Sequence, residues 1–185
     1  LGATALLAGP ALFWAAAEFG RRPAPGAYAA PGLQPVGPEA AREDLSTLLP
    51  ALLLVVYDAF GRKDEAEIYD TLAVAAAGEA LEKLYLERVG AMVGGGAETK
   101  QPIHGLHLVE AASELSGETF RVDARWQVFA TVSHSVHVHV RRNTYRANLT
   151  IAPVEGAWKI TDFELTDVDR QTAGEPVEVD LPWWN

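Results

Sequence analysis

The sequence predicts an α+β fold, in which amino-terminal helices pack on a curved antiparallel sheet of about four strands. Two observations predict it. Apolar residues recur at three- to four-residue spacing between residues 39 and 92, and at two-residue spacing from residue 120 to residue 165. The first spacing is typical of an amphipathic helix, and the second of a strand with one buried face. Such elements pack as layers around a shared core.

The first 17 residues form an apolar run without a charged side chain. Because a helix needs about 20 residues to cross a bilayer, residues 1–20 predict a membrane anchor helix and a single-pass protein, in contact with lipid through residues 1–17. Arg21 and Arg22 follow the run and favour a cytoplasmic soluble domain over a periplasmic one. A retained signal sequence and a buried soluble helix are the alternatives. The residues expected in the membrane are Leu6, Leu7, Leu12, Phe13 and Trp14.

Residues 21–38 contain five prolines and three glycines. This density disfavours a helix or a central strand, so the segment is predicted to be an extended linker. The formal net charge of −10 argues against nucleic acid as a partner, because nucleic acid attracts basic surfaces. The absence of cysteine excludes disulfides and zinc–thiolate sites.

Helical spacing begins near residue 38 and continues to residue 62, with Pro50 inside the segment. Proline removes a backbone hydrogen bond, so we expect a kink or two consecutive helices there. Gly61 is a suitable helix end, and Asp64 is a suitable N-cap for a second helix. Gly78 is expected to separate this helix from a third one over residues 79–92.

Four strands are predicted in the second half of the chain. A shorter strand covers residues 103–109, and a long half-buried strand covers residues 120–132. In the next strand, residues 136–151, the apolar positions change from even to odd numbers, which predicts a bulge or bend at residues 141–144. The last strand covers residues 157–167.

Three stretches resemble a known superfamily. The sequences YDAFGRKD at residues 57–64 and IYDTLA at residues 68–73 resemble the first helices of the nuclear-transport-factor-2-like superfamily, and GAWKITDFEL at residues 156–165 is similar to its closing strand. The resemblance covers about residues 40–168 and implies a cone-shaped α+β barrel with a central pocket, as in ketosteroid isomerase and scytalone dehydratase relatives. Many members are non-catalytic binding or assembly modules. We therefore place a domain at residues 39–168, followed by an acidic tail at residues 169–185.

His137 and His139 are two residues apart on a predicted strand, a spacing that can present two imidazoles to a metal ion such as zinc. A third ligand would come from His104, His107 or Asp123. The competing interpretation buries the intervening valines at positions 136, 138 and 140 and leaves the histidines in solvent. We predict no metal site, with His137 and His139 as the candidates for one.

An isomerase-type reaction needs a carboxylate base in an apolar pocket and a donor for the developing oxyanion. The residues of suitable type are Tyr57, Tyr69, Tyr85, Asp70 and Asp123. No base and donor pair can be transferred from the enzymes of the superfamily to these positions. Asp123 alternates with buried residues, so we expect it to be an exposed ion-pair partner of Arg121 or Arg125. The sequence therefore predicts no catalytic residue and no cofactor.

The tail ends in Leu181, Pro182, Trp183, Trp184 and Asn185. Large aromatic residues are frequent anchors of protein interfaces, so Leu181, Trp183 and Trp184 are the predicted partner-binding residues. The alternatives are that the two tryptophans cover the sheet of the domain itself or contact the bilayer interface. The predicted function is a non-catalytic, membrane-tethered interaction module, an accessory or structural subunit whose partners are other membrane protein subunits. The sequence does not distinguish whether this complex is respiratory, photosynthetic, a transport complex or part of the cell envelope. One alternative is a small-molecule-binding protein or an isomerase- or dehydratase-type enzyme, and another is a metal-binding module.

Overall fold

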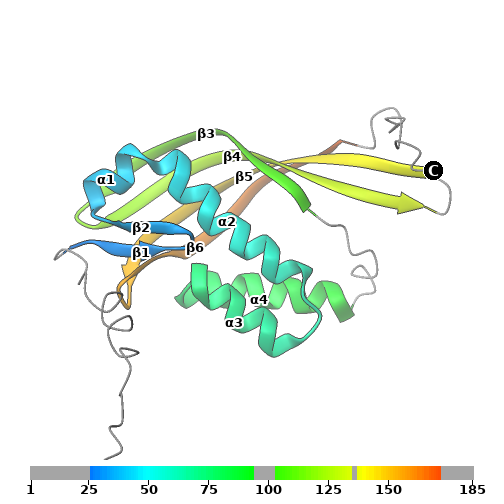
Figure 1. The fold of residues 1–185 in the computed structure, drawn as a ribbon, viewed down its shortest axis with the longest axis horizontal. Helices are drawn as coiled ribbons and strands as arrows, with labels where there is room; N and C mark the ends of the chain where they lie inside the picture. Colours follow the sequence, from blue (N-terminus) through cyan, green and yellow to red (C-terminus); the bar gives the residue numbers. More distant parts are fainter. Residues whose placement is uncertain (1–25, 94–102, 135–136, 172–185) are drawn as a thin grey trace, which may run out of the picture.

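The computed structural model describes residues 26–93, 103–134 and 137–171, and for residues 131–141, 170 and 171 it describes the backbone alone. Two short strands come first, then four helices, then four long strands (Figure 1). The elements are β1 Tyr28–Ala30, β2 Leu33–Val36, α1 Pro38–Glu43, α2 Leu45–Gly61, α3 Glu65–Ala75, α4 Gly78–Val93, β3 Ile103–Ser116, β4 Thr119–His134, β5 His137–Val154 and β6 Ala157–Gln171.

The strands form one curled six-stranded sheet in the order β2-β1-β6-β5-β4-β3. It is a mixed sheet, because β1 pairs parallel to β6 while the other neighbours are antiparallel. The predicted antiparallel sheet of about four strands is therefore wrong. Its four strands correspond to β3 to β6, and the two additional strands come from the segment predicted to be a linker.

The segment at residues 28–36 forms strands because it lies at an edge of the sheet. Pro31 and Gly32, with φ of +70° at Gly32, suit the two central positions of a tight turn between β1 and β2. Pro35 is tolerated because β2 is the edge strand, where a missing N–H breaks no central ladder. The hairpin is tied to the core by Trp158, whose Nε1 donates to the Val36 carbonyl at 3.1 Å.

The break between α1 and α2 falls at Asp44 rather than at Pro50, which lies inside α2. The Asp44 carboxylate accepts a hydrogen bond from the Thr47 hydroxyl at 2.6 Å, so local polar contacts define the start of the helix. The other helix boundaries agree with the predictions. α2 ends at Gly61, and the backbone N–H of Glu67 donates to the Asp64 carboxylate at 3.0 Å as an N-cap.

The bulge predicted at residues 141–144 is absent from the pairing of β4 with β5, which runs without a shift from Phe120 and Ile151 to His134 and His137. Bulges occur on β6 instead, where the register shifts leave Thr161 and Thr166 without a paired residue on β5. Their hydroxyls donate to backbone carbonyls of β5, at 3.3 Å and 3.1 Å. These extra residues bend β6, which contributes to the curl of the sheet.

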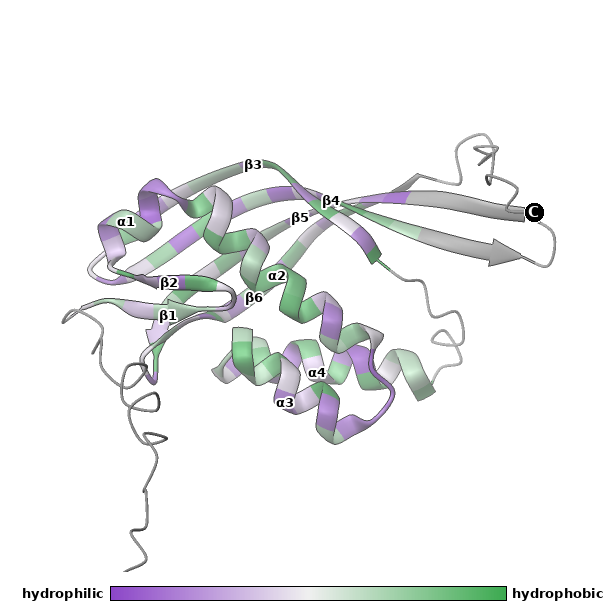
Figure 2. Cartoon of the chain, in the orientation of Figure 1, coloured by the Kyte–Doolittle hydropathy of each residue, from purple (hydrophilic) through white to green (hydrophobic). Residues whose placement is uncertain are grey.

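The core lies between one face of the sheet and the helices, and Figure 2 shows that much of α2 is hydrophobic. Helix α2 supplies seven buried residues, and alternate residues of β4 face it. The large side chains that are fully buried on the sheet are Phe120, Trp126, Ile151, Trp158 and Ile160. No charged side chain is buried anywhere in residues 26–93, 103–130 and 142–169.

No helix in the described residues is long and apolar enough to cross a membrane. The anchor predicted at residues 1–20, with Leu6, Leu7, Leu12, Phe13 and Trp14, lies outside those residues. The structure therefore gives no support to the prediction of a single-pass membrane protein with a transmembrane helix. An apolar run of 17 residues is by itself weak evidence, since α2 has the same length and its apolar residues are buried against the sheet.

Candidate partner-binding groove

Strand β3 is the unprotected edge of the sheet. At the opposite edge, β2 has four residues and contains Pro35. The free side of β6 is contacted where the N–H of Ala77, between α3 and α4, donates to the Ile160 carbonyl at 2.9 Å. β3 has 14 residues, and none of them is proline, lysine or arginine, the residues that commonly blunt an edge strand. One side of β3 therefore presents backbone groups that no strand of the described chain pairs with.

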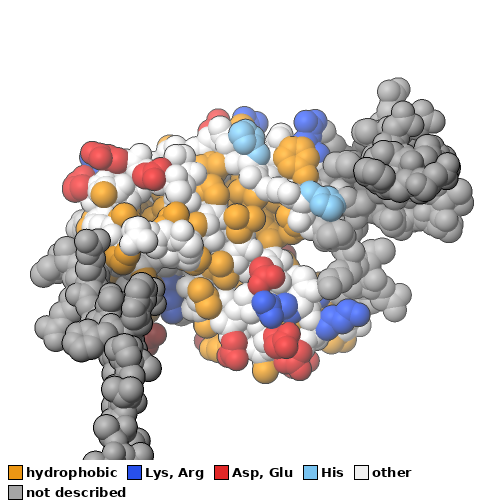
Figure 3. All heavy atoms as spheres, viewed as in Figure 1, with side chains coloured by type: hydrophobic (Ala, Val, Ile, Leu, Met, Phe, Trp, Pro, Cys, Tyr) orange, Lys and Arg blue, Asp and Glu red, His pale blue; other side chains and the backbone are white. Residues whose placement is uncertain are grey.

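A groove of about 680 Å³ runs between this edge and helices α1 and α2. On the helix side it is lined by Arg42, Glu43, Leu45, Ser46 and Pro50, and on the strand side by residues 106–111 and Ser113. Figure 3 shows hydrophobic side chains gathered across the middle of this face of the molecule. The lining mixes charged and polar side chains with apolar ones. An edge strand beside such a groove is a surface that can take up an extended peptide.

Two bulges interrupt β3. The register with β4 shifts between Ile103 and Gly105 and again between Leu108 and Glu110, which leaves His104 and Val109 as the extra residues. Bulges limit edge pairing, but here they leave residues 105–108 and 110–116 in continuous register. Val109 is 38% exposed and lines the groove, so this bulge presents an apolar rather than a charged side chain.

The uncovered face of the sheet, opposite the core, carries a network of exposed ion pairs. Arg146 is 3.2 Å from Asp123 and 3.5 Å from Glu110, which is also 3.5 Å from Arg125. Asp123 is thus an exposed ion-pair partner as predicted, although its arginine lies on β5 rather than on β4. Exposed pairs of this kind each contribute about 0–1 kcal/mol to stability.

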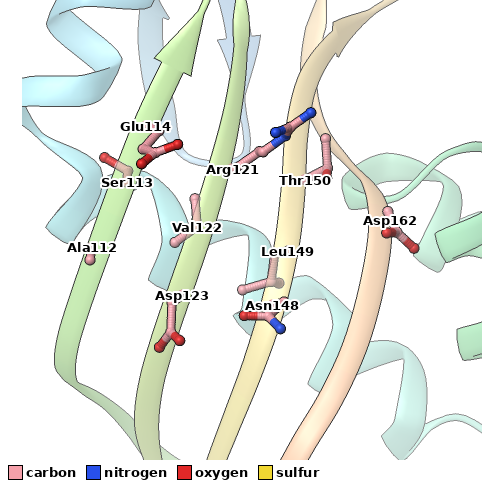
Figure 4. A pocket seen from close by; sticks show the side chains of 10 residues that line it. All are labelled: Ala112, Ser113, Glu114, Arg121, Val122, Asp123, Asn148, Leu149, Thr150 and Asp162. Atoms are coloured by element: carbon pink, nitrogen blue, oxygen red, sulfur yellow. The ribbon is translucent and has the colours of Figure 1, made fainter.

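A second hollow, of about 630 Å³, lies on this polar face (Figure 4). Figure 4 shows Glu114, Arg121 and Asp162 projecting from β3, β4 and β6 around it. Its lining combines three carboxylates, the Arg121 guanidinium and the Asn148 amide with apolar residues such as Val122 and Leu149. The charged side chains are accessible to solvent. The hollow is open to solvent and lacks the enclosure that is typical of a small-molecule site.

Tyr57, one of the isomerase-type candidates, is a partly buried residue of α2 that packs against the core. Its hydroxyl accepts a hydrogen bond from Trp126 Nε1 at 2.9 Å, and the Trp126 ring stacks on Tyr145 with centroids 5.8 Å apart. Burial raises the pKa of Tyr57 far above its ordinary value. No carboxylate is buried beside it in the described part of the chain. Tyr57 therefore has a structural role, in which its hydroxyl accepts the hydrogen bond of the buried Trp126 indole.

The other isomerase-type candidates lie apart from Tyr57. Tyr69 on α3 is 44% exposed and meets the ring of Tyr85 on α4 edge-on, with centroids 5.5 Å apart. The Tyr85 hydroxyl donates to the Glu65 carboxylate at 3.5 Å, and Asp70 is exposed. The fold does not bring these residues together around a cavity.

Two candidates for a third metal ligand, His107 and Asp123, are separated from His139. His107 pairs with Gln127, whereas His139 pairs with Val132, five residues farther along β4. At about 3.3 Å per residue these positions are about 17 Å apart, so His107 cannot share an ion with His139. Asp123 is still farther along β4 and is engaged with Arg146. Among the side chains that the structure describes, no three potential ligands gather at one place.

The partner-binding residues predicted in the tail, Leu181, Trp183 and Trp184, lie outside the described residues. Sequence reasoning missed the groove, because it treated residues 103–109 only as a short strand of the sheet. The available signal was the absence of proline, lysine and arginine from residues 103–116. That signal becomes informative only when the strand is known to lie at an edge.

Comparisons with known proteins do not identify the chain. No family model matches it, and no curated protein matches it. Among solved structures, it is similar to the intermembrane space region of the chloroplast protein ARC6, with a TM-score of 0.44, 17% identity, 70% of this chain and 96% of that chain covered. It is also similar to a de novo designed β-sheet protein, with a TM-score of 0.33, 12% identity and coverage of 77% and 98%. Neither neighbour indicates a function, and the resemblance to the nuclear-transport-factor-2-like superfamily receives no support.

Tyr57→Phe is expected to destabilise the domain by about 1–3 kcal/mol, because the buried Trp126 N–H loses its acceptor. Denaturation in urea would measure this change. Tyr69→Phe is the matched control, since it removes a hydroxyl from a side chain that is 44% exposed. Equal stability of the two variants would contradict the structural role of Tyr57.

Proposed function

We propose that this chain is a non-catalytic protein-interaction module, an accessory or structural subunit of a larger protein assembly. It binds an extended segment of a partner protein along β3. The observation that carries the proposal is the unpaired edge of β3 beside the groove formed with α1 and α2. The scarcity of buried polar groups in the described core also favours binding over catalysis.

The partner segment would add to the sheet as a further strand. Main-chain hydrogen bonds to β3 provide affinity that depends little on sequence, whereas side-chain pockets provide selectivity. In a strand, alternate side chains point to one side. The groove side of the segment would therefore carry apolar side chains opposite Leu106, Leu108 and Val109, and polar ones opposite the charged residues of the lining.

Docking requires little rearrangement of the domain. The β3 strand is already held by β4 along residues 103–116, and α2 packs against it. The backbone groups that bind the partner are thus ordered before binding. Pre-ordering reduces the entropy lost on association.

The proposal is tested with a displayed library of random linear peptides, selected on the wild-type chain. Val109→Lys is expected to weaken the selected peptides at least about tenfold, or about 1.4 kcal/mol. The lysine places a charge at the groove and is a residue that blocks edge pairing. Fluorescence anisotropy of labelled peptides measures the affinity.

Val74→Lys is the matched control, because Val74 is 52% exposed on α3 and does not line the groove. It should leave peptide affinity unchanged. Hydrogen exchange should also show slower amide exchange in residues 105–116 when peptide is bound. Peptides that bind Val109→Lys as well as wild type, or that protect another element, would refute the proposed groove.

A further inference from the structure

Strands β4 and β5 continue beyond their neighbours. β3 begins at Ile103, opposite Ala130 of β4, and β6 ends at Gln171, opposite Arg142 of β5. Beyond these pairs, residues 131–134 and 137–140 pair only with each other in the described chain. Figure 1 shows this two-stranded arm projecting from the body.

The register of the arm places three histidines together. His134 pairs directly with His137, and His139 is two residues farther along β5, opposite Val132. No shift interrupts the β4–β5 pairing. In an unshifted antiparallel ladder, opposite residues and residues two apart belong to the same face. His134, His137 and His139 therefore occupy neighbouring register positions on one face of the arm.

The spacings suit a shared ion. Opposite residues have Cβ atoms about 4.5–5.5 Å apart, residues two apart on a strand are about 7 Å apart, and diagonal neighbours about 7–8 Å. Zinc lies about 2.0–2.1 Å from an imidazole nitrogen, and imidazole is a ligand that suits zinc, copper and nickel. Three imidazoles leave further coordination positions for water or for a group of a partner.

We propose that His134, His137 and His139 form a binding site for a divalent transition-metal ion of the zinc, copper and nickel class. Cross-strand pairing adds the register position of His134 to the two positions that local spacing suggests. A two-stranded hairpin is marginally stable alone, and a metal held by both strands couples binding to ordering of the arm. The proposal does not depend on the peptide-binding function of β3.

The test uses the full chain, purified without a histidine tag and treated with chelator, and titrates zinc by isothermal calorimetry. One zinc ion per chain is expected. Removing a group that merely hydrogen-bonds to a metal ligand lowers metal affinity about 10–100-fold. Removing a ligand itself should cost at least as much, so we expect His134→Gln and His139→Gln each to lower zinc affinity at least about tenfold. His107→Gln is the control and should leave affinity unchanged, because its register position lies about 17 Å from that of His139.

Hydrogen exchange provides the second readout. Zinc should slow amide exchange in residues 131–140 of the wild-type chain and not in His134→Gln. Near-UV circular dichroism confirms that the variants keep the folded core. Zinc below one equivalent, wild-type affinity in His134→Gln, or a loss in His107→Gln as large as in the other variants would each overturn the proposal.

Discussion

Trp126→Ala is expected to destabilise the domain by about 3–5 kcal/mol, a cost typical of removing a large buried aromatic side chain. Trp126 is 1% exposed, stacks on Tyr145 and donates to Tyr57. The substitution leaves a cavity between α2 and the sheet and removes the donor that the Tyr57 hydroxyl accepts from. Natural domains are stable by only about 5–15 kcal/mol, so the variant should unfold at a much lower urea concentration.

Leu86→Ala is the control for this experiment, because Leu86 is 66% exposed on α4. Its stability should stay within about 0.5 kcal/mol of wild type. Urea denaturation followed by far-UV circular dichroism measures both variants. A Trp126→Ala protein as stable as Leu86→Ala would show that α2 does not pack on β4 as described.

Deletion of residues 181–185 is expected to weaken assembly with a partner protein at least about tenfold while the domain remains folded. Burial of one tryptophan removes about 150–250 Å² from water, which at about 25 cal/mol per Å² is worth several kcal/mol before ordering costs. In the described residues, the core has Phe120, Trp126 and Trp158 as its largest side chains. Stability is therefore expected to be unchanged.

The measurement combines co-purification at native expression with urea denaturation of the truncated chain. Trp183→Ala and Trp184→Ala, made separately, show which tryptophan matters. A truncated chain that unfolds at lower urea would place the tryptophans in the core of the domain. Recovery of the full chain alone at native expression would count against an accessory subunit.

Local signals predicted the helices well. Asp64 and Gly61 act as the expected cap and stop, because capping depends on a few neighbouring residues. The break at Asp44 was missed, since Pro50 is the stronger breaker on propensity alone. The contact of Asp44 with Thr47 is equally local, but it is not distinctive in sequence.

The strands at residues 28–36 show the limit of such reasoning. Proline and glycine density correctly excludes a central strand, yet the same residues form a hairpin at the edge of the sheet. The hairpin is held by Trp158, which lies 122 positions from Val36 in the chain. Pairing over that distance depends on the completed fold and leaves no local trace.

For the candidate sites, too, the sequence shows one part of the arrangement and the tertiary structure decides the rest. The two-residue spacing of His137 and His139 is visible in the sequence, but the register of β4 with β5 decides that His134 accompanies them and that His107 does not. The even spacing of apolar residues likewise determined that β4 has one buried face. Only the tertiary structure decided that β3 is an open edge beside α1 and α2, because strand order depends on contacts between residues far apart in the chain.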